Sequence, residues 1–130
     1  MAIDTISEWH RVLDERDLDG LGALIHDDAV FHSPIVHTPQ RGKELTLFYL
    51  NAAFHVLLDN DFHYVREVVG ERDAFLEFQA TIDGVVVNGV DMIRFDDDGL
   101  IVDFKVMVRP MKAISLMHGQ MAKMLESMKG

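Results

Sequence analysis

The sequence predicts an α+β domain in which helices pack against one mostly antiparallel sheet. Three observations support this class. Apolar residues recur at helical spacing near both ends of the chain, residues 62–109 alternate between apolar and polar side chains, and short turns separate the alternating segments. A chain of 130 residues is long enough for a sizeable core, and we treat residues 1–130 as a single domain.

Two helices are expected at the N-terminal end. Residues 4–16 contain Thr5 followed by Glu8, a capping-box pattern, together with an apolar stripe at spacings of three and four. Asp17 is then placed to cap a second, short helix. We expect the polar residues 26–28 to form a turn that ends this second helix.

A strand, a loop and a third helix are expected next. Residues 29–33 read as a short strand that ends at Pro34. Residues 34–42 contain two prolines and a glycine, which favours a surface loop. The segment 42–58 is apolar over most of its girth, so we expect a helix that is buried or that lines a cavity.

Four strands in a meander complete the predicted sheet. Residues 62–71 and 74–82 form the first two, and Asp83-Gly84 is a strong hairpin signal before the third strand, which starts at Val85. An acidic turn with a glycine joins the third strand to the fourth.

Asp91 is the one charged member of an otherwise apolar row on the third of these strands. Alternation gives it these neighbours on the same face: Val87, Gly89, Ile93 and Phe95. A carboxyl group among apolar side chains is unfavourable unless it is paired, protonated or open to a ligand. We interpret Asp91 as a pocket residue, and the alternative is a structural pair with His32, Trp9 or Arg94.

Composition argues against several classes of function. The net charge of −10 argues against a nucleic-acid partner, and no apolar run approaches the ~20 residues of a membrane helix. The absence of cysteine excludes thiolate metal sites, and no histidine pair has metal-binding spacing. We expect no metal and no cofactor. The N-terminal residues do not resemble a signal peptide, so we expect a cytoplasmic protein.

Residues 111–129 are expected to form a C-terminal helix with a narrow, methionine-rich apolar seam. Three interpretations of this helix are open: packing on its own domain, a lid over a cavity, or an arm in a dimer. The outer face of the sheet also mixes apolar and charged side chains: Val90, Met92, Arg94, Lys105 and Met107. Such a face usually finds a partner, so we expect a two-fold homodimer through it.

Several short motifs, in this order and spacing, carry a family resemblance: Asp17-Leu18-Asp19-Gly20-Leu21, Ala29-Val30-Phe31-His32-Ser33-Pro34, Arg41-Gly42, and Asp91-Met92-Ile93-Arg94-Phe95 followed by Gly99-Leu100-Ile101. The chain over about residues 4–110 resembles the nuclear transport factor two-like superfamily, and most closely its SnoaL-like branch. The resemblance implies a cone-shaped α+β barrel, with helices on a curved sheet around a hydrophobic cavity. It also implies that dimers pair through the outer sheet face.

The superfamily includes ketosteroid isomerases and polyketide cyclases, and the resemblance implies a role for Asp91. In the isomerases, an aspartate in the place of Asp91 stays protonated and donates a hydrogen bond to an oxyanion. The general-base aspartate of the isomerases falls at Ser33 here, and their oxyanion tyrosine falls at Trp9. His32 is the candidate to replace the base. Neighbours on a strand face opposite sides, so only one of His32 and Ser33 is expected to enter the cavity.

These observations favour a small hydrophobic ligand in an internal cavity, with cofactor-free isomerase or cyclase chemistry. Asp91 would be the general acid or hydrogen-bond donor, and His32 the base. The expected ligand contacts are Trp9, Ser33, Phe48, Phe54, Phe78, Ile93, Phe104 and Val106. The alternative is a non-catalytic ligand-binding or dimerisation module in which Asp91 is structural.

Overall fold

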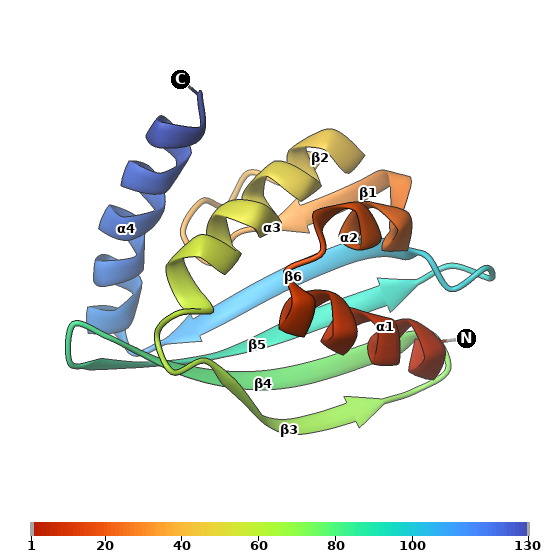
Figure 1. Ribbon diagram of the computed structural model, residues 1–130, viewed down its shortest axis with the longest axis horizontal. Coiled ribbons are helices and arrows are strands. Elements are labelled where there is room, and N and C mark those ends of the chain that lie inside the picture. The colour runs from red at the N-terminus through yellow and green to blue at the C-terminus, as the bar shows by residue number, and fades with distance from the viewer. Residues whose placement is uncertain (1, 130) are drawn as a thin grey trace.

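The computed structural model describes residues 2–129, which form helices packed on a single sheet (Figure 1). The helices are α1 (Ala2–Glu15), α2 (Leu18–Leu24), α3 (Lys43–Leu57) and α4 (Met111–Lys129). The strands are β1 (Ile25–His32), β2 (Gln40–Arg41), β3 (His63–Val69), β4 (Asp73–Ile82), β5 (Val85–Phe95) and β6 (Ile101–Arg109). The predicted α+β class, the meander and the C-terminal helix are confirmed.

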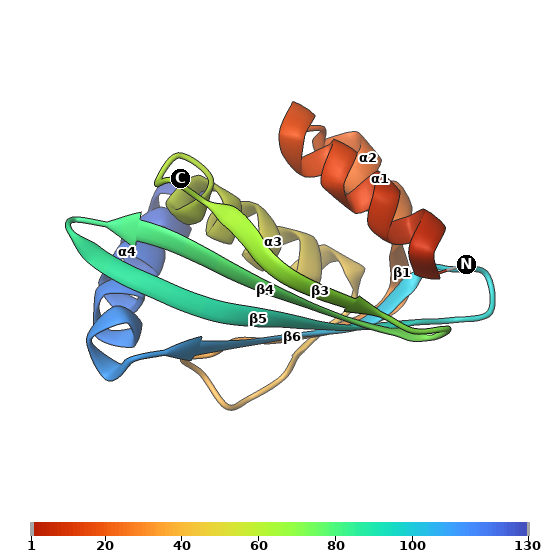
Figure 2. The ribbon, with the colours of Figure 1, turned by 90° about the horizontal axis from the view of Figure 1, so that it is seen from below.

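The six described strands form one sheet in the order β2-β1-β6-β5-β4-β3. The pairing of β1 with β6 is parallel and the other pairings are antiparallel. Figure 2 shows that the sheet is curved, that α1, α2 and α3 cover one face, and that α4 stands across one end. The sheet stays open between its edge strands β2 and β3, so the predicted cone is not a closed barrel.

The hairpin between β4 and β5 has the predicted tight turn. Asp83 and Gly84 both have positive φ angles, of 50° and 78°, and Ile82 pairs with Val85 across the turn. Positive φ at both central residues is the geometry of a type I′ turn, whose twist matches that of the flanking strands. This turn fixes the register of β5, and therefore the face on which Asp91 lies.

Three local predictions were wrong. Helix α1 begins at Ala2, and Thr5 does not cap it, because its hydroxyl donates to the carbonyl of Gly99 at 2.6 Å. Residues 26–28 lie inside β1, where the pairing with β6 shifts register between Ile25 and Val30. The predicted loop 34–42 contains β2, which pairs with β1. In each case a tertiary contact outweighs a local polar pattern.

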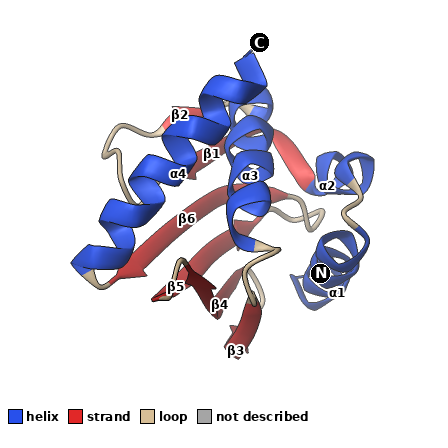
Figure 3. Cartoon of the chain, turned by 60° about the vertical axis from the view of Figure 1, so that its left-hand side comes forward, coloured by secondary structure: helices blue, strands red, loops and turns tan. Residues whose placement is uncertain are grey.

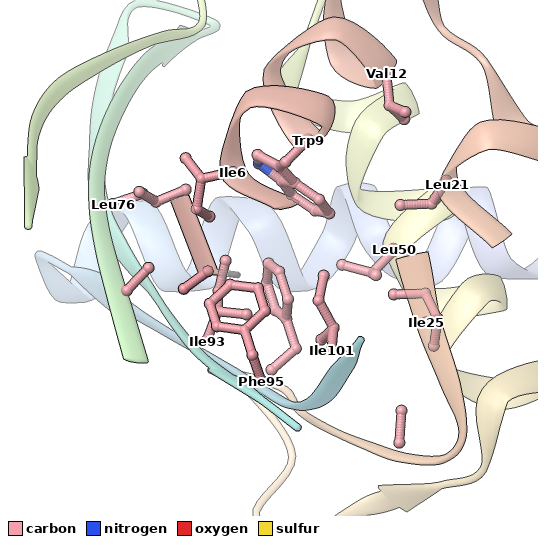
Figure 4. Close-up of a cluster of buried hydrophobic side chains, with 14 of the residues drawn as sticks. Ile6, Trp9, Val12, Leu21, Ile25, Leu50, Leu76, Ile93, Phe95 and Ile101 are labelled. Carbon is pink, nitrogen blue, oxygen red and sulfur yellow. The ribbon is translucent and has the colours of Figure 1, made fainter. Parts of the chain in front are cut away.

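The core lies between α1 and the inner face of the sheet. Trp9 is only 1% exposed, and its ring centroid lies 5.2 Å from that of Phe104 on β6. Figure 4 shows the labelled apolar side chains of α1, β4 and β5 meeting in this layer, with Trp9 above Ile93 and Phe95. These side chains fill the interior beneath α1. They also hold Trp9 in place at the edge of the cavity that it lines.

Gly89 on β5 allows the ring of Phe78 to lie directly over the strand. The two residues are register partners, and a Cβ at Gly89 would overlap Cζ of Phe78 and lie 2.8 Å from the carbonyl oxygen of Met107. We expect Gly89→Ala to lower the free energy of unfolding by about 1–3 kcal/mol through overpacking, as measured by urea denaturation. Gly119→Ala is the control, because nothing lies within 4 Å of that Cβ position. Equal stability of Gly89→Ala and the wild type would contradict this account.

Candidate functional site

A cavity of about 210 Å³ opens between the concave face of the sheet and the helices. Its inner wall is buried and aromatic, with Trp9, Phe78 and Phe104 each 1% exposed. The rest of the lining comes from α3, from α4 and from the loop after β1, in which Val36 is 49% exposed. The exposed lining residues Val36 and His118 show that the cavity reaches the surface beside this loop and α4. Figure 3 shows α4 lying beside α3 along this side of the molecule.

Six of the predicted ligand contacts line this cavity: Trp9, Ser33, Phe54, Phe78, Phe104 and Val106. Two are absent from the lining. Ile93 follows Asp91 by two residues on the same face, but it lies in the solid core at 1% exposure. Phe48 is replaced by its neighbour Tyr49, whose ring stacks on Phe31 with a centroid separation of 5.7 Å.

Asp91 ends a short chain of hydrogen bonds inside the cavity wall. The indole Nε1–H of Trp9 donates to the hydroxyl oxygen of Tyr64 at 2.9 Å. The hydroxyl of Tyr64 in turn donates to Oδ2 of Asp91 at 3.1 Å. Each group therefore has a defined role, since an indole only donates and Tyr64 both accepts and donates. The chain fixes the orientation of the carboxyl group.

Burial sets the protonation of Asp91. Its side chain is surrounded by apolar residues, and this desolvation raises its pKa from 3.8 to about 7, although the hydrogen bond from Tyr64 acts in the opposite direction. Burial also raises the pKa of Tyr64 well above 10, so Tyr64 remains a neutral donor. Near neutral pH, Asp91 is therefore present in both its protonated and its ionised form.

The second carboxyl oxygen of Asp91 is open to the cavity. Oδ2 is occupied by Tyr64, and no described residue bonds to Oδ1. In residues 2–129 no fully buried side-chain nitrogen or oxygen lacks a partner, so Oδ1 is not sealed from the cavity. Because Oδ2 already accepts a hydrogen bond, a proton on Asp91 is best placed on Oδ1, the oxygen that is open to the cavity.

His32 lies outside the cavity, so the structure does not support it as the base beside Asp91. Its Nε2 lies 2.8 Å from Oδ1 of Asp103, on the outer side of the sheet. Ser33 is the member of the pair that lines the cavity. His32 is the last residue of β1 and Ser33 directly follows it, so of these two neighbours only Ser33 reaches the cavity.

The site has the architecture of a known family. Residues 6–104 match the model of the SnoaL-like domain. The chain belongs to the SnoaL-like family. A steroid delta-isomerase from Pseudomonas aeruginosa has 44% sequence identity to this chain and a TM-score of 0.91, covering 97% of this chain and 92% of its own.

Two further solved structures resemble this SnoaL-like chain. An uncharacterised protein with a cystatin-like fold from Silicibacter pomeroyi is 28% identical, with a TM-score of 0.81 over 95% of this chain and 83% of its own. The epoxide hydrolase/cyclase-like enzyme SalBIII, of pyran ring formation in salinomycin, shares the fold at 16% identity and a TM-score of 0.67, over 86% of this chain and 92% of its own. The comparison with curated proteins finds no match.

Sequence patterns missed one part of this SnoaL-like site and left a second part open. Tyr64 lies on β3, where most side chains are exposed and the register shifts between Tyr64 and Arg66, so alternation gives no clear inner face. The other part is the face of α4 that lines the cavity: Met117, His118, Met121, Ala122 and Leu125. Helix α4 therefore packs on its own domain and closes the cavity, which leaves the dimer arm as the untested interpretation.

Residues 2–129 contain no group of three or more His, Cys, Asp or Glu side chains that could hold a metal ion. Within the same residues, no helix is both long and apolar enough to span a bilayer.

Proposed function

We propose that this SnoaL-like chain binds a small, neutral, hydrophobic ligand and converts it without a cofactor, as an isomerase or a cyclase. Asp91 acts as the general acid or hydrogen-bond donor. The observation that carries this proposal is the free Oδ1 of Asp91 in an apolar cavity, on a carboxyl group whose pKa is raised to about 7. An acid with a pKa near the working pH is well suited to proton transfer.

The composition of the cavity wall supports a neutral ligand. No lysine or arginine is among the lining residues, and Asp91 is the only carboxylate. A buried anionic ligand would meet no fixed positive charge and would be repelled by ionised Asp91. A carbonyl or epoxide oxygen, in contrast, can accept a hydrogen bond from protonated Asp91 while its carbon skeleton contacts the aromatic walls.

The chemistry follows from charge that develops on this oxygen. Migration of a β,γ double bond into conjugation with a carbonyl group begins when water in the cavity removes a proton from the α carbon, and it ends when that proton is returned at the γ carbon. Negative charge develops on the carbonyl oxygen between these two steps, and opening of an epoxide during ring closure likewise places negative charge on oxygen. A donor fixed in an apolar site stabilises that charge more strongly than water does. The 44% identity to a steroid delta-isomerase supports the isomerase form of the proposal.

The second candidate is a non-catalytic ligand-binding module in which Asp91 is structural. One observation favours it: the described cavity wall contains no second carboxylate to act as base. The family resemblance implies that Ser33 stands at the position of the base. In this case the cavity binds ligand, and the bond from Tyr64 to Asp91 only organises the wall.

A panel of β,γ-unsaturated ketones, from one ring to a four-ring steroid, distinguishes the two candidates. Isomerisation to the conjugated enone is followed by ultraviolet absorbance, and we expect turnover at least about 100-fold above the buffer rate. Binding is followed by the fluorescence of Trp9, the single tryptophan of the chain. Saturable binding without turnover would favour the non-catalytic module. The absence of both binding and turnover would contradict the proposal.

We also propose a homodimer that forms through the outer sheet face. On this face Phe75 is 45% exposed, Met107 52% and Val68 64%, and these apolar side chains lie beside Arg66 and Arg109. We expect sedimentation at twice the mass of one chain, and a shift of Met107→Asp to monomer because a carboxylate would be buried at the interface. Met111→Asp, at an 81% exposed position on α4, is the control. A monomeric wild type would contradict this proposal.

We also propose that the protein is located in the cytoplasm, because the chain contains no cysteine.

A further inference from the structure

We infer that the ligand carries two acceptor oxygens, one bound by Asp91 and the other by the hydroxyl of Ser33. This inference rests on the proposed function, because it takes Asp91 as the site of the first oxygen. It adds a second recognition point and narrows the ligand class to neutral compounds with two oxygen functions, such as diketones and hydroxyketones.

The hydroxyl of Ser33 is fixed in position and free to donate. Its Oγ accepts hydrogen bonds from the backbone N–H groups of Ile35 at 3.0 Å and Val36 at 3.3 Å. These two bonds use the oxygen as an acceptor and leave its proton available. No described residue accepts a bond from this hydroxyl, and Ser33 lines the cavity. The proton is therefore available to an acceptor inside the cavity.

The register of the sheet brings Ser33, which directly follows β1, toward the row that contains Asp91. On one side of β6, Asp91 is the partner of Val106. On the other side, His32, the last residue of β1, is the partner of Lys105, and Ser33 follows it directly, so one more residue of extended chain brings Ser33 toward Val106. Two strand spacings put the backbones of Ser33 and Asp91 about 10 Å apart. The three side chains all line the cavity, so one compact ligand can contact both polar groups.

The remaining polar groups of the wall do not offer the same geometry. The indole of Trp9 and the hydroxyl of Tyr64 are already used in the chain that ends at Asp91. His118 lies on an exposed position of α4, at the mouth of the cavity. Ser33 is thus the polar group that combines a fixed position, a free proton and a place near the row that contains Asp91.

The test compares two bicyclic probes of equal shape, 2-decalone and decalin-2,6-dione, by quenching of Trp9 fluorescence. Wild-type protein is expected to bind the dione about 2- to 10-fold more tightly, the effect of one additional hydrogen bond. Ser33→Ala is expected to remove this preference, so that the variant binds the two probes with equal affinity. Ser33→Thr, which keeps the hydroxyl, should retain the preference, and Ser115→Ala at an exposed position of α4 is the matched control.

Two other results would overturn the inference. One is a wild-type protein that binds both probes equally. The other is a Ser33→Ala variant that weakens both probes to the same extent, which would assign Ser33 only to the shape of its loop. Failure of the proposed function looks different: the monoketone then binds to no form of the protein, or binds equally to the wild type and to Asp91→Ala.

Discussion

Asp91→Asn is expected to lower kcat/KM for the best substrate of the ketone panel at least about 100-fold, because an amide cannot transfer the proton. The variant should remain folded. Asparagine has nearly the same shape as aspartate, and its side-chain oxygen can still accept the hydrogen bond from Tyr64. The loss should therefore appear in turnover and not in the circular dichroism spectrum.

Asp103→Asn is the matched control for this measurement, because Asp103 faces His32 on the outer side of the sheet and not the cavity. Its turnover should equal that of the wild type. If Asp91→Asn kept full activity, or if both variants lost activity equally, Asp91 would not be the acid.

The pH profile of wild-type activity shows whether Asp91 acts as an acid or as a base. The protonated form is the acid, and the pKa is raised to about 7, so kcat/KM should be constant at lower pH and fall as the pH rises through about 7. A profile that rises through the same range would identify ionised Asp91 as a base.

The second large effect concerns stability. The native protein holds a proton on Asp91 up to about pH 7, whereas the unfolded chain releases it near 3.8. Between these values the native state binds the additional proton, so the free energy of unfolding falls as the pH rises. The difference between the two pKa values corresponds to a loss of about 4 kcal/mol.

Comparison with Asp91→Asn isolates this effect, because all other titrating groups are common to the two proteins. The stability of the wild type relative to the variant should decline by about 4 kcal/mol between about pH 4 and about pH 8, as measured by urea denaturation. A difference that does not change with pH would contradict a raised pKa. A relative stability of the wild type that increases with pH would indicate a carboxylate stabilised by the fold.

This loss of stability at neutral pH means that packing alone does not account for a carboxyl group at position 91. An apolar residue at this position would extend the row of β5 and would not require protonation. A buried carboxyl group with one free oxygen weakens the fold at neutral pH, which supports the proposal that Asp91 serves a ligand.

The sequence patterns that predicted the fold correctly are local ones: strand alternation, a tight turn and an apolar seam at helical spacing. Strict alternation on β5 placed Asp91 on the inner face, and the Asp83-Gly84 turn fixed its register. Helix α4 followed from its apolar seam. Thr5 was misinterpreted because a capping pattern is local, whereas its hydroxyl bonds Gly99, which is distant in sequence.

The site was harder to predict because it depends on contacts between distant strands. Tyr64 gives no signal in the sequence, since β3 is an edge strand with exposed apolar residues such as Val65. Alternation indicated that only one of His32 and Ser33 could enter the cavity, but it could not identify which one. The parallel pairing of β1 with β6 decides in favour of Ser33.

The most direct test of this account is the titration of Asp91 by carbon-13 NMR of its carboxyl group. The signal is assigned by its absence from Asp91→Asn. We predict a midpoint at about pH 7, so that a substantial fraction of Asp91 is protonated under neutral conditions. A midpoint near the ordinary aspartate value of about 3.9 would show an ionised carboxylate at neutral pH and would contradict its role as the acid of the cavity.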